Sequence, residues 1–182
     1  MEKSIVVFGS YIGGISVHIR EIKVEDAESF VNLVKQVENE SPFMLMEAGE
    51  RETTALQQRK QLENLKQQNH STIFVVEQDE GKLVGYLIAV GGNVRKKKHS
   101  AYLVIGITED YRGKGLGKKL FHQLEQWAIE RQISRLELTV VTENESAVSL
   151  YKKVGFEIEG LKRNSLIIAQ KYYDEYYMAK LL

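Results

Sequence analysis

A nearly continuous apolar run, a glycine-rich loop and an amphipathic helix follow one another in the middle of this chain, and this succession constrains the fold most strongly. Residues 100–107, SAYLVIGI, are almost all apolar, which is typical of a strand buried on both faces of a sheet. Such a strand, followed by such a helix, predicts an α/β protein with helices on the faces of its sheet. The apolar helix face comprises Leu116, Leu120, Phe121, Leu124, Trp127 and Ala128.

Comparable patterns occupy the rest of the chain and predict the order β-α-α-β-β-β-α-β-α-β-β, which is a mixed sheet. Amphipathic helices are also predicted at 24–40, 53–69 and 143–154, the second with a thin apolar stripe of Leu56, Leu62 and Leu65. The other predicted strands lie at 16–22, 71–92 (two strands joined by a turn at Asp79–Lys82), 133–141, 155–160 and 174–182.

Composition excludes several classes of function. Lysine plus arginine and aspartate plus glutamate are both 25, so no net charge attracts the chain to nucleic acid or an anionic membrane. There is no cysteine, and the four histidines are scattered without metal-ligand spacing, so we expect no metal. No run approaches the roughly 20 apolar residues of a membrane span, and we expect a cytoplasmic protein.

The length of 182 residues fits one domain. Residues 1–16 contain a short apolar stretch that glycines interrupt, and no signal-peptide cleavage site follows it. We therefore interpret 1–16 as an N-terminal extension, either an extra strand or a loose arm, ahead of a single domain at 17–182.

The loop DYRGKGLGKK at 110–119 predicts an anion-binding site. It matches neither the P-loop nor the dinucleotide fingerprint, because Lys118 stands where the latter needs its third glycine. A helix start carries unpaired N–H groups and a partial positive charge, and it normally attracts a capping side chain and acids. This one offers glycines and more cations, which favours a docked polyanion that approaches the backbone closely. A flexible connection with solvated lysines is the alternative.

Two motifs around this loop resemble the GNAT superfamily of acetyl-CoA-dependent N-acetyltransferases. YRGKGLG at 111–117 is similar to motif A of that family, and NESAVSLYKKVGF at 144–156 is similar to its motif B. The resemblance extends over the element order from about Val17 to Leu182. It implies a GNAT-like mixed, mostly antiparallel seven-stranded sheet, flanked by about four helices, in which the fourth and fifth strands splay apart.

The resemblance also implies how acetyl-CoA, the acetyl donor, is bound. Backbone N–H groups of the loop would hold the CoA pyrophosphate, and backbone groups of Ile105 and Ile107 on the fourth strand would pair with the pantetheine arm and the acetyl carbonyl. Gly106 between them fits a bulge, a close ligand approach or simple packing of a small residue. The implied loop residues are Arg112, Gly113, Lys114, Gly115, Leu116, Gly117 and Lys118.

Two residues of motif B receive roles through the resemblance. Tyr151 occupies the family's general-acid position and would protonate the CoA sulfur, although a tyrosine that only packs against the helix is the alternative. Asn144 would cap the helix and reach the CoA arm, or act as a cap alone.

The sequence does not identify the residue that acts as the general base. Many GNAT enzymes place a glutamate on the fourth strand, but residues 100–108 contain no acid, and Tyr102 is the only polar ring of that strand. Glu47 is a candidate because it lies where the family builds its acceptor pocket, and Glu137 on the fifth strand is another. A chain of water molecules is equally compatible with the sequence.

We expect an N-acetyltransferase that acts on a small primary amine such as an amino acid or a polyamine. A protein N-terminal or lysine acetyltransferase and a non-catalytic acetyl-CoA-binding module are the alternatives. The segment 171–182 resembles the branch that acetylates amino acids, small amines and phosphinothricin. Residues 43–46 fit a pocket wall, the core or a dimer contact, so a homodimer is left open. The basic run 95–99 fits a solvated turn, with contact to the CoA 3′-phosphate or to an acidic partner as the alternative.

Overall fold

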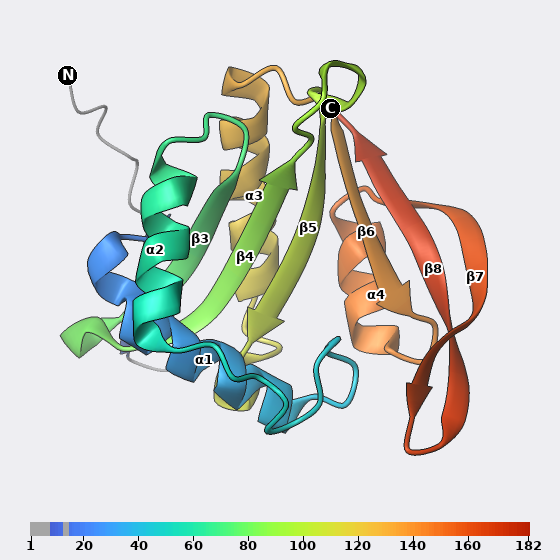
Figure 1. Ribbon diagram of the computed structural model, residues 1–182, viewed down its shortest axis with the longest axis horizontal. Helices are drawn as coiled ribbons and strands as arrows, with labels where there is room; N and C mark the ends of the chain where they lie inside the picture. The colour runs from blue at the N-terminus through green and yellow to red at the C-terminus, as the bar shows by residue number, and fades with distance from the viewer. Residues whose placement is uncertain (1–7, 13–14) are drawn as a thin grey trace.

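The computed structural model describes residues 8–12 and 15–182, which form one mixed α/β unit (Figure 1). The helices are α1 (Ala27–Glu40), α2 (Ala55–Lys66), α3 (Leu116–Glu130) and α4 (Glu145–Lys153), accompanied by short 3-10 turns. The strands are β1 (Phe8–Ile12), β2 (Ile15–Glu21), β3 (Thr72–Gln78), β4 (Leu83–Gly91), β5 (Ser100–Ile107), β6 (Arg135–Val141), β7 (Glu157–Ile168) and β8 (Lys171–Leu181). None of these helices is long and apolar enough to cross a membrane.

The strands form a single sheet in the order β1-β2-β3-β4-β5-β6-β8-β7. Every neighbouring pair is antiparallel except β5 and β6, which run parallel. The predicted mostly antiparallel, seven-stranded sheet with four helices is therefore confirmed from β2 onward. One further strand, β1, lies within the sixteen residues expected as an extension and pairs with β2 at the sheet edge.

The parallel strands β5 and β6 pair over three residues only, from Ser100 and Arg135 to Tyr102 and Glu137. Beyond Tyr102 the two strands separate, as the diverging ribbons in Figure 1 show. The predicted splay is thus confirmed, and five residues of β5 continue without a partner strand on the β6 side. Unpaired strand edges present free N–H and C=O groups, so this gap offers backbone hydrogen bonds to a ligand.

Two hydrophobic cores lie on opposite faces of the sheet. In Figure 1, α1 and α2 cover one face, and α3 lies behind the other. The α3 face buries Phe121 and Leu124 completely, and each such side chain contributes roughly 1.5–3 kcal/mol to folding. On the other face, Phe30 of α1 and Leu62 of α2 pack against Tyr86 of β4 and its neighbours.

Two local expectations are corrected. Leu56, placed in the apolar stripe of α2, is 65% exposed, and only Leu62 and Leu65 of that stripe pack against the core. Strands β7 and β8 extend beyond the predicted 155–160 and 174–182, and they form a long hairpin. Its turn uses Ala169 and Gln170, both with positive φ, where glycine or asparagine is the usual signal.

Candidate active site

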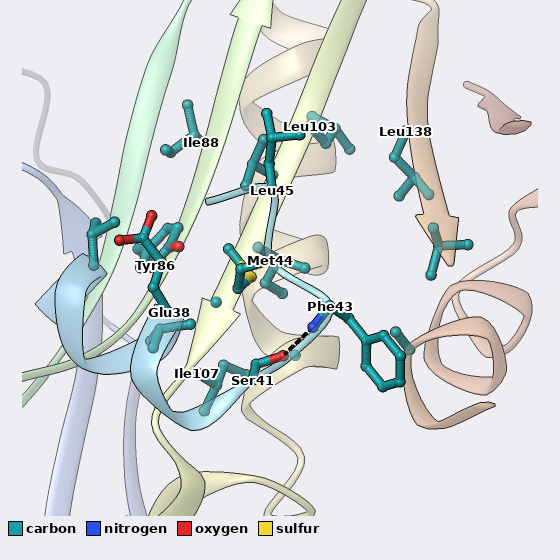
Figure 2. Close-up of a pocket in the computed structure, with 18 of the residues that line it drawn as sticks. Glu38, Ser41, Phe43, Met44, Leu45, Tyr86, Ile88, Leu103, Ile107 and Leu138 are labelled. Atoms are coloured by element: carbon teal, nitrogen blue, oxygen red, sulfur yellow. Dashed lines mark hydrogen bonds between the residues drawn. The ribbon is translucent and has the colours of Figure 1, made fainter. Parts of the chain in front are cut away.

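A cavity of about 960 Å³ opens where β5 and β6 separate. Its walls come from α1, α2, the segment between them, the glycine loop and α4. Figure 2 shows Tyr86 and Ile88 of β4 on one side of the cavity, Leu138 of β6 on the other, and Phe43 reaching toward α4. The α1–α2 connection therefore lies across the gap rather than beside it.

The start of α3 carries no capping side chain. Thr54 caps α2 and Asn144 caps α4, whereas α3 begins after Gly115, which has a φ of 82° and a ψ of 0° and offers no side chain. In the part of the chain that the structure describes, no protein oxygen accepts a hydrogen bond from the N–H groups of 113–118. The first helical bond is the one from the N–H of Lys119 to the carbonyl of Gly115. A run of unpaired donors at the positive end of a helix is suited to an anion.

Glycine is required in this loop for two different reasons. Gly113 and Gly115 adopt positive φ angles of 71° and 82°, and a Cβ atom at either would meet nothing within 4 Å. Their missing side chains therefore leave open space beside the unpaired donors. Gly117 has an internal reason, because a Cβ there would lie 2.6 Å from the Leu150 side chain of α4. Close approach of α3 and α4 thus fixes the third glycine.

Most residues that the resemblance assigned to acetyl-CoA line this one cavity. Lys114 is the one residue of this set that does not line the cavity. Its ammonium lies over the Tyr111 ring, 5.1 Å from the ring centre. Those that line it are Ile105, Ile107, Arg112, Gly113, Gly115, Leu116, Gly117, Lys118, Asn144 and Tyr151. Their roles in binding CoA stay predictions.

The Arg112 side chain is engaged within the protein. Its Nε donates to the carbonyl of Ile107 at 2.9 Å, and its Nη2 lies 3.7 Å from the Glu40 carboxylate at the end of α1. The same carboxylate accepts the N–H of Glu109 at 2.6 Å. Arg112 therefore ties the end of β5 to α1, which holds one rim of the cavity in place. A contact between its guanidinium and a phosphate is not needed to explain its position.

The backbone of β5 turns alternate N–H groups toward the gap. Thr108 donates its N–H to Val84 of β4, so the N–H groups of Ile107 and Ile105 point the opposite way, toward the space that β6 has left. The β4–β5 register runs without interruption past Gly106, so there is no bulge at this position. A Cβ on Gly106 would lie 2.6 Å from the Tyr86 ring, which makes packing of a small residue the explanation for this glycine.

Tyr151 lies on α4 with its ring in the α3-side core. It meets Phe121 edge-on, with ring centroids 5.8 Å apart, and it packs against Phe156. Burial raises the pKa of Tyr151 above that of a free phenol, and Tyr102 nearby raises it further. Among the described residues none hydrogen-bonds its hydroxyl, and the residue borders the cavity. The hydroxyl is therefore a neutral donor with no partner in the described part of the chain.

The structure does not bring the two carboxylate candidates for the base to the cavity. Glu47 is exposed, contacts Glu50 through its backbone, and is not part of the cavity lining. Glu137 accepts from Arg135 at 2.9 Å at the paired end of β5 and β6. Tyr102 instead bridges the two strands, because its hydroxyl lies 2.8 Å from the Thr139 hydroxyl.

A buried polar cluster in the cavity wall was not predicted from the sequence. Glu38 of α1 is 4% exposed and bonds Arg51, while Gln58 of α2 and Tyr86 of β4 are also buried at the cavity. The available signal was Glu38 itself, which follows Val34 by one helical turn and so lies on the apolar face of α1. A carboxylate on a buried helix face is rarely found without a partner.

Comparisons with known proteins agree with this geometry. The model of the acetyltransferase (GNAT) family matches residues 36–156. The L-amino acid N-acetyltransferase AaaT of Escherichia coli strain K12 is 30% identical over 106 residues, which are 56% of this chain and 64% of that protein. The chain thus spans less than two thirds of the length of that relative.

Solved structures share the architecture. A GNAT-family acetyltransferase from Streptococcus pneumoniae matches with a TM-score of 0.86 and 29% identity, over 91% of this chain and 99% of that one. The protein yncA from Salmonella typhimurium, solved with its cofactor acetyl-CoA, shares the fold with a TM-score of 0.80, 16% identity and coverage of 91% of this chain and 94% of that one. Because the family model matches more than half of the residues of this chain, the chain belongs to the GNAT family of acetyltransferases.

Proposed function

We propose that this protein transfers an acetyl group from acetyl-CoA to the primary amine of a small molecule. The observation that carries the proposal is the uncapped start of α3, where the N–H groups of 113–118 have no acceptor within the described chain and open onto the cavity between β5 and β6. A diphosphate satisfies several such donors at once and lies at the favourable end of the helix dipole.

The free edge of β5 is suited to the pantetheine arm and acetyl group of acetyl-CoA. A pantetheine arm carries amide groups that can pair with a strand edge, and β5 offers that edge from Leu103 to Ile107. In this arrangement the N–H of Ile105 would donate to the acetyl carbonyl and stabilise the negative charge that develops there. Tyr151 would donate to the sulfur as the thiolate leaves.

A small acceptor is supported by the wall that covers the gap. The α1–α2 connection carries Met44 and Leu45 across the cavity, which narrows the opening that an extended polypeptide would have to enter (Figure 2). The E. coli relative is named as an L-amino acid N-acetyltransferase, which points to the same class of acceptor. We propose that the base is a water molecule or the backbone, since neither Glu47 nor Glu137 lines the cavity. The carboxylates that do line it are each paired with a cation: Glu38 with Arg51, Glu40 with Arg112 and Glu175 with Lys162. We also propose, from the scattered histidines and the lack of cysteine, that no metal takes part.

One assay tests this proposal. The purified protein is incubated with acetyl-CoA and with separate panels of amino acids, polyamines and peptides, while the release of free thiol is followed. Thiol release with amino acids or polyamines is the expected result. Release with peptides alone would replace the proposal by a protein acetyltransferase, and CoA binding without any release would replace it by a non-catalytic module.

A further inference from the structure

A buried ion pair in the cavity wall has no role in the chemistry described so far. Arg51 donates from its Nε to both oxygens of Glu38, at 2.9 and 3.0 Å, and from its Nη2 at 2.6 Å. The Glu38 side chain is 3% exposed, whereas the Arg51 side chain is 26% exposed, and both residues line the cavity. Of the two charges, only the guanidinium is accessible to a ligand.

The geometry of this pair leaves one edge of the guanidinium free. Glu38 occupies the side formed by Nε and Nη2, and Nη1 has no partner among the residues that the structure describes. A guanidinium carries five N–H donors in a rigid plane, so the edge formed by Nη1 and the second N–H of Nη2 remains available. That edge has the shape that a carboxylate accepts through two parallel hydrogen bonds.

Two other polar groups of the cavity wall have no hydrogen-bond partner among the described residues. The Gln58 residue is 8% exposed and lines the cavity, yet no group in the described residues bonds its side-chain amide. The Tyr86 hydroxyl is likewise unpaired within the described chain, and the charge of Glu38 acts on it. Both residues line the cavity, and their polar atoms are not among the fully buried unpaired atoms of the described chain, so this wall is suited to a ligand with several polar atoms.

We propose that Arg51 binds the carboxylate of the acceptor, so that the protein acetylates amino acids in preference to amines that lack a carboxylate. This inference rests on the proposed acetyl transfer and names the residue that selects the acceptor. Glu38 is a positioning residue: it fixes the guanidinium plane and leaves the outer edge of Arg51 exposed. Because the Glu38 side chain is only 3% exposed, its carboxylate is not accessible to the acceptor ammonium.

A purely structural pair would behave differently. The ion pair joins α1 to the segment before α2, thirteen residues further along, and it stabilises that connection in either case. If this were its only role, weakening it would affect all acceptors equally. If Arg51 binds the acceptor carboxylate, weakening the pair affects only acceptors that carry a carboxylate, mainly by raising their KM.

The test compares each amino acid with its decarboxylated amine, for example L-leucine with 3-methylbutylamine and L-phenylalanine with 2-phenylethylamine. Arg51→Lys keeps the charge beside Glu38 but loses the planar fork. We expect it to reduce the ratio of kcat/KM for amino acid over amine at least about tenfold, mainly through KM of the amino acid. Arg59→Lys, on the exposed side of α2 and outside the cavity, should leave the ratio unchanged.

A second variant removes both charges. The double variant Glu38→Gln, Arg51→Gln leaves no unpaired buried charge, so it should still fold, whereas Arg51→Ala alone would leave Glu38 buried and unpaired. This double variant should lose the carboxylate preference while it still acetylates the amine. A ratio within about twofold of that of the unmodified protein in both variants would overturn the inference.

Calorimetry separates this inference from the activity itself. If the unmodified protein acetylates nothing, binding of L-leucine and of 3-methylbutylamine to the protein–CoA complex is measured instead. Binding of L-leucine alone, lost in Arg51→Lys, would retain the inference and remove the proposed activity. Equal binding of both compounds, or binding of neither, would overturn the inference.

Discussion

Replacing Gly115 by alanine separates the two properties that the structure gives this residue. Its φ of 82° costs an L-residue roughly 1–2 kcal/mol, so Gly115→Ala should lower the free energy of unfolding by about that amount. No atom lies within 4 Å of the added Cβ, so no steric cost inside the protein adds to it. For a domain of this length, the midpoint of thermal unfolding should fall by roughly 2–8 °C.

The same methyl group should weaken CoA binding much more than it weakens the fold. It would project into the open space beside the unpaired N–H groups of 113–118, where the diphosphate is proposed to lie. Each hydrogen bond to a charged acceptor contributes about 1.5–3 kcal/mol, so losing one lowers the affinity by roughly 10- to 150-fold. Isothermal titration of the folded variant with CoA measures this change directly.

Gly81 provides a matched control. It lies in the turn between β3 and β4 with a φ of +80°, and an added Cβ would come no closer than 3.7 Å to a side-chain oxygen of Glu77. Gly81→Ala should therefore show the same loss of stability with an unchanged affinity for CoA. Equal CoA affinities in the two variants would refute the argument that the open space at Gly115 is where the diphosphate binds.

Three further predictions concern packing, acid stability and catalysis. Gly106→Ala places a Cβ 2.6 Å from the rigid ring of Tyr86, so urea unfolding should show a loss of about 1–3 kcal/mol. The hydrogen bond from Arg20 holds the pKa of Glu77 below its usual range. The stabilisation of the fold that results is complete above about pH 4.3 and is lost as the pH falls through the lower folded pKa. Arg20→Leu should therefore flatten the pH dependence of the free energy of unfolding, measured in urea titrations from about pH 3 to about pH 7. Tyr151→Phe should lower kcat at least about tenfold and leave the calorimetric affinity for CoA nearly unchanged; an unaltered kcat would remove Tyr151 from the reaction.

The parts of this fold that could be predicted are those whose signal is local. The apolar face of α3 is buried as its spacing predicts, with Leu120, Phe121 and Leu124 fully enclosed. The uncapped start of α3 was also visible, because capping residues lie within a few positions of the helix they cap. Loop, helix and charge all lie within one short stretch of sequence, and the structure keeps them together.

The parts that could not be predicted depend on partners distant in sequence. Gly106 is explained by Tyr86 on the neighbouring strand, which a linear pattern does not show. Arg112 is engaged by Glu40, seventy-two residues earlier, so a cation beside the glycine loop turns out to hold the scaffold. Leu56 is instead a local error of the prediction, because it lies about 120° around the helix from Leu62 and so faces solvent. Gln58 occupies the buried position one turn before Leu62.

The raised pKa of Tyr151 restricts what this residue can do for the reaction. A free phenol has a pKa of about 10 and a thiol one of about 8.5, and burial moves Tyr151 further above the thiol. Full proton transfer from Tyr151 to a departing thiolate is therefore uphill by more than about 2 kcal/mol. A hydrogen bond from the neutral hydroxyl has no such cost and still stabilises the developing charge on sulfur. The proton that finally reaches CoA must then originate in the acceptor amine, which sheds it on forming the amide. Since the hydroxyl stays protonated as the pH rises, its ionisation should cause no loss of rate up to about pH 10, and any alkaline decline belongs to another group.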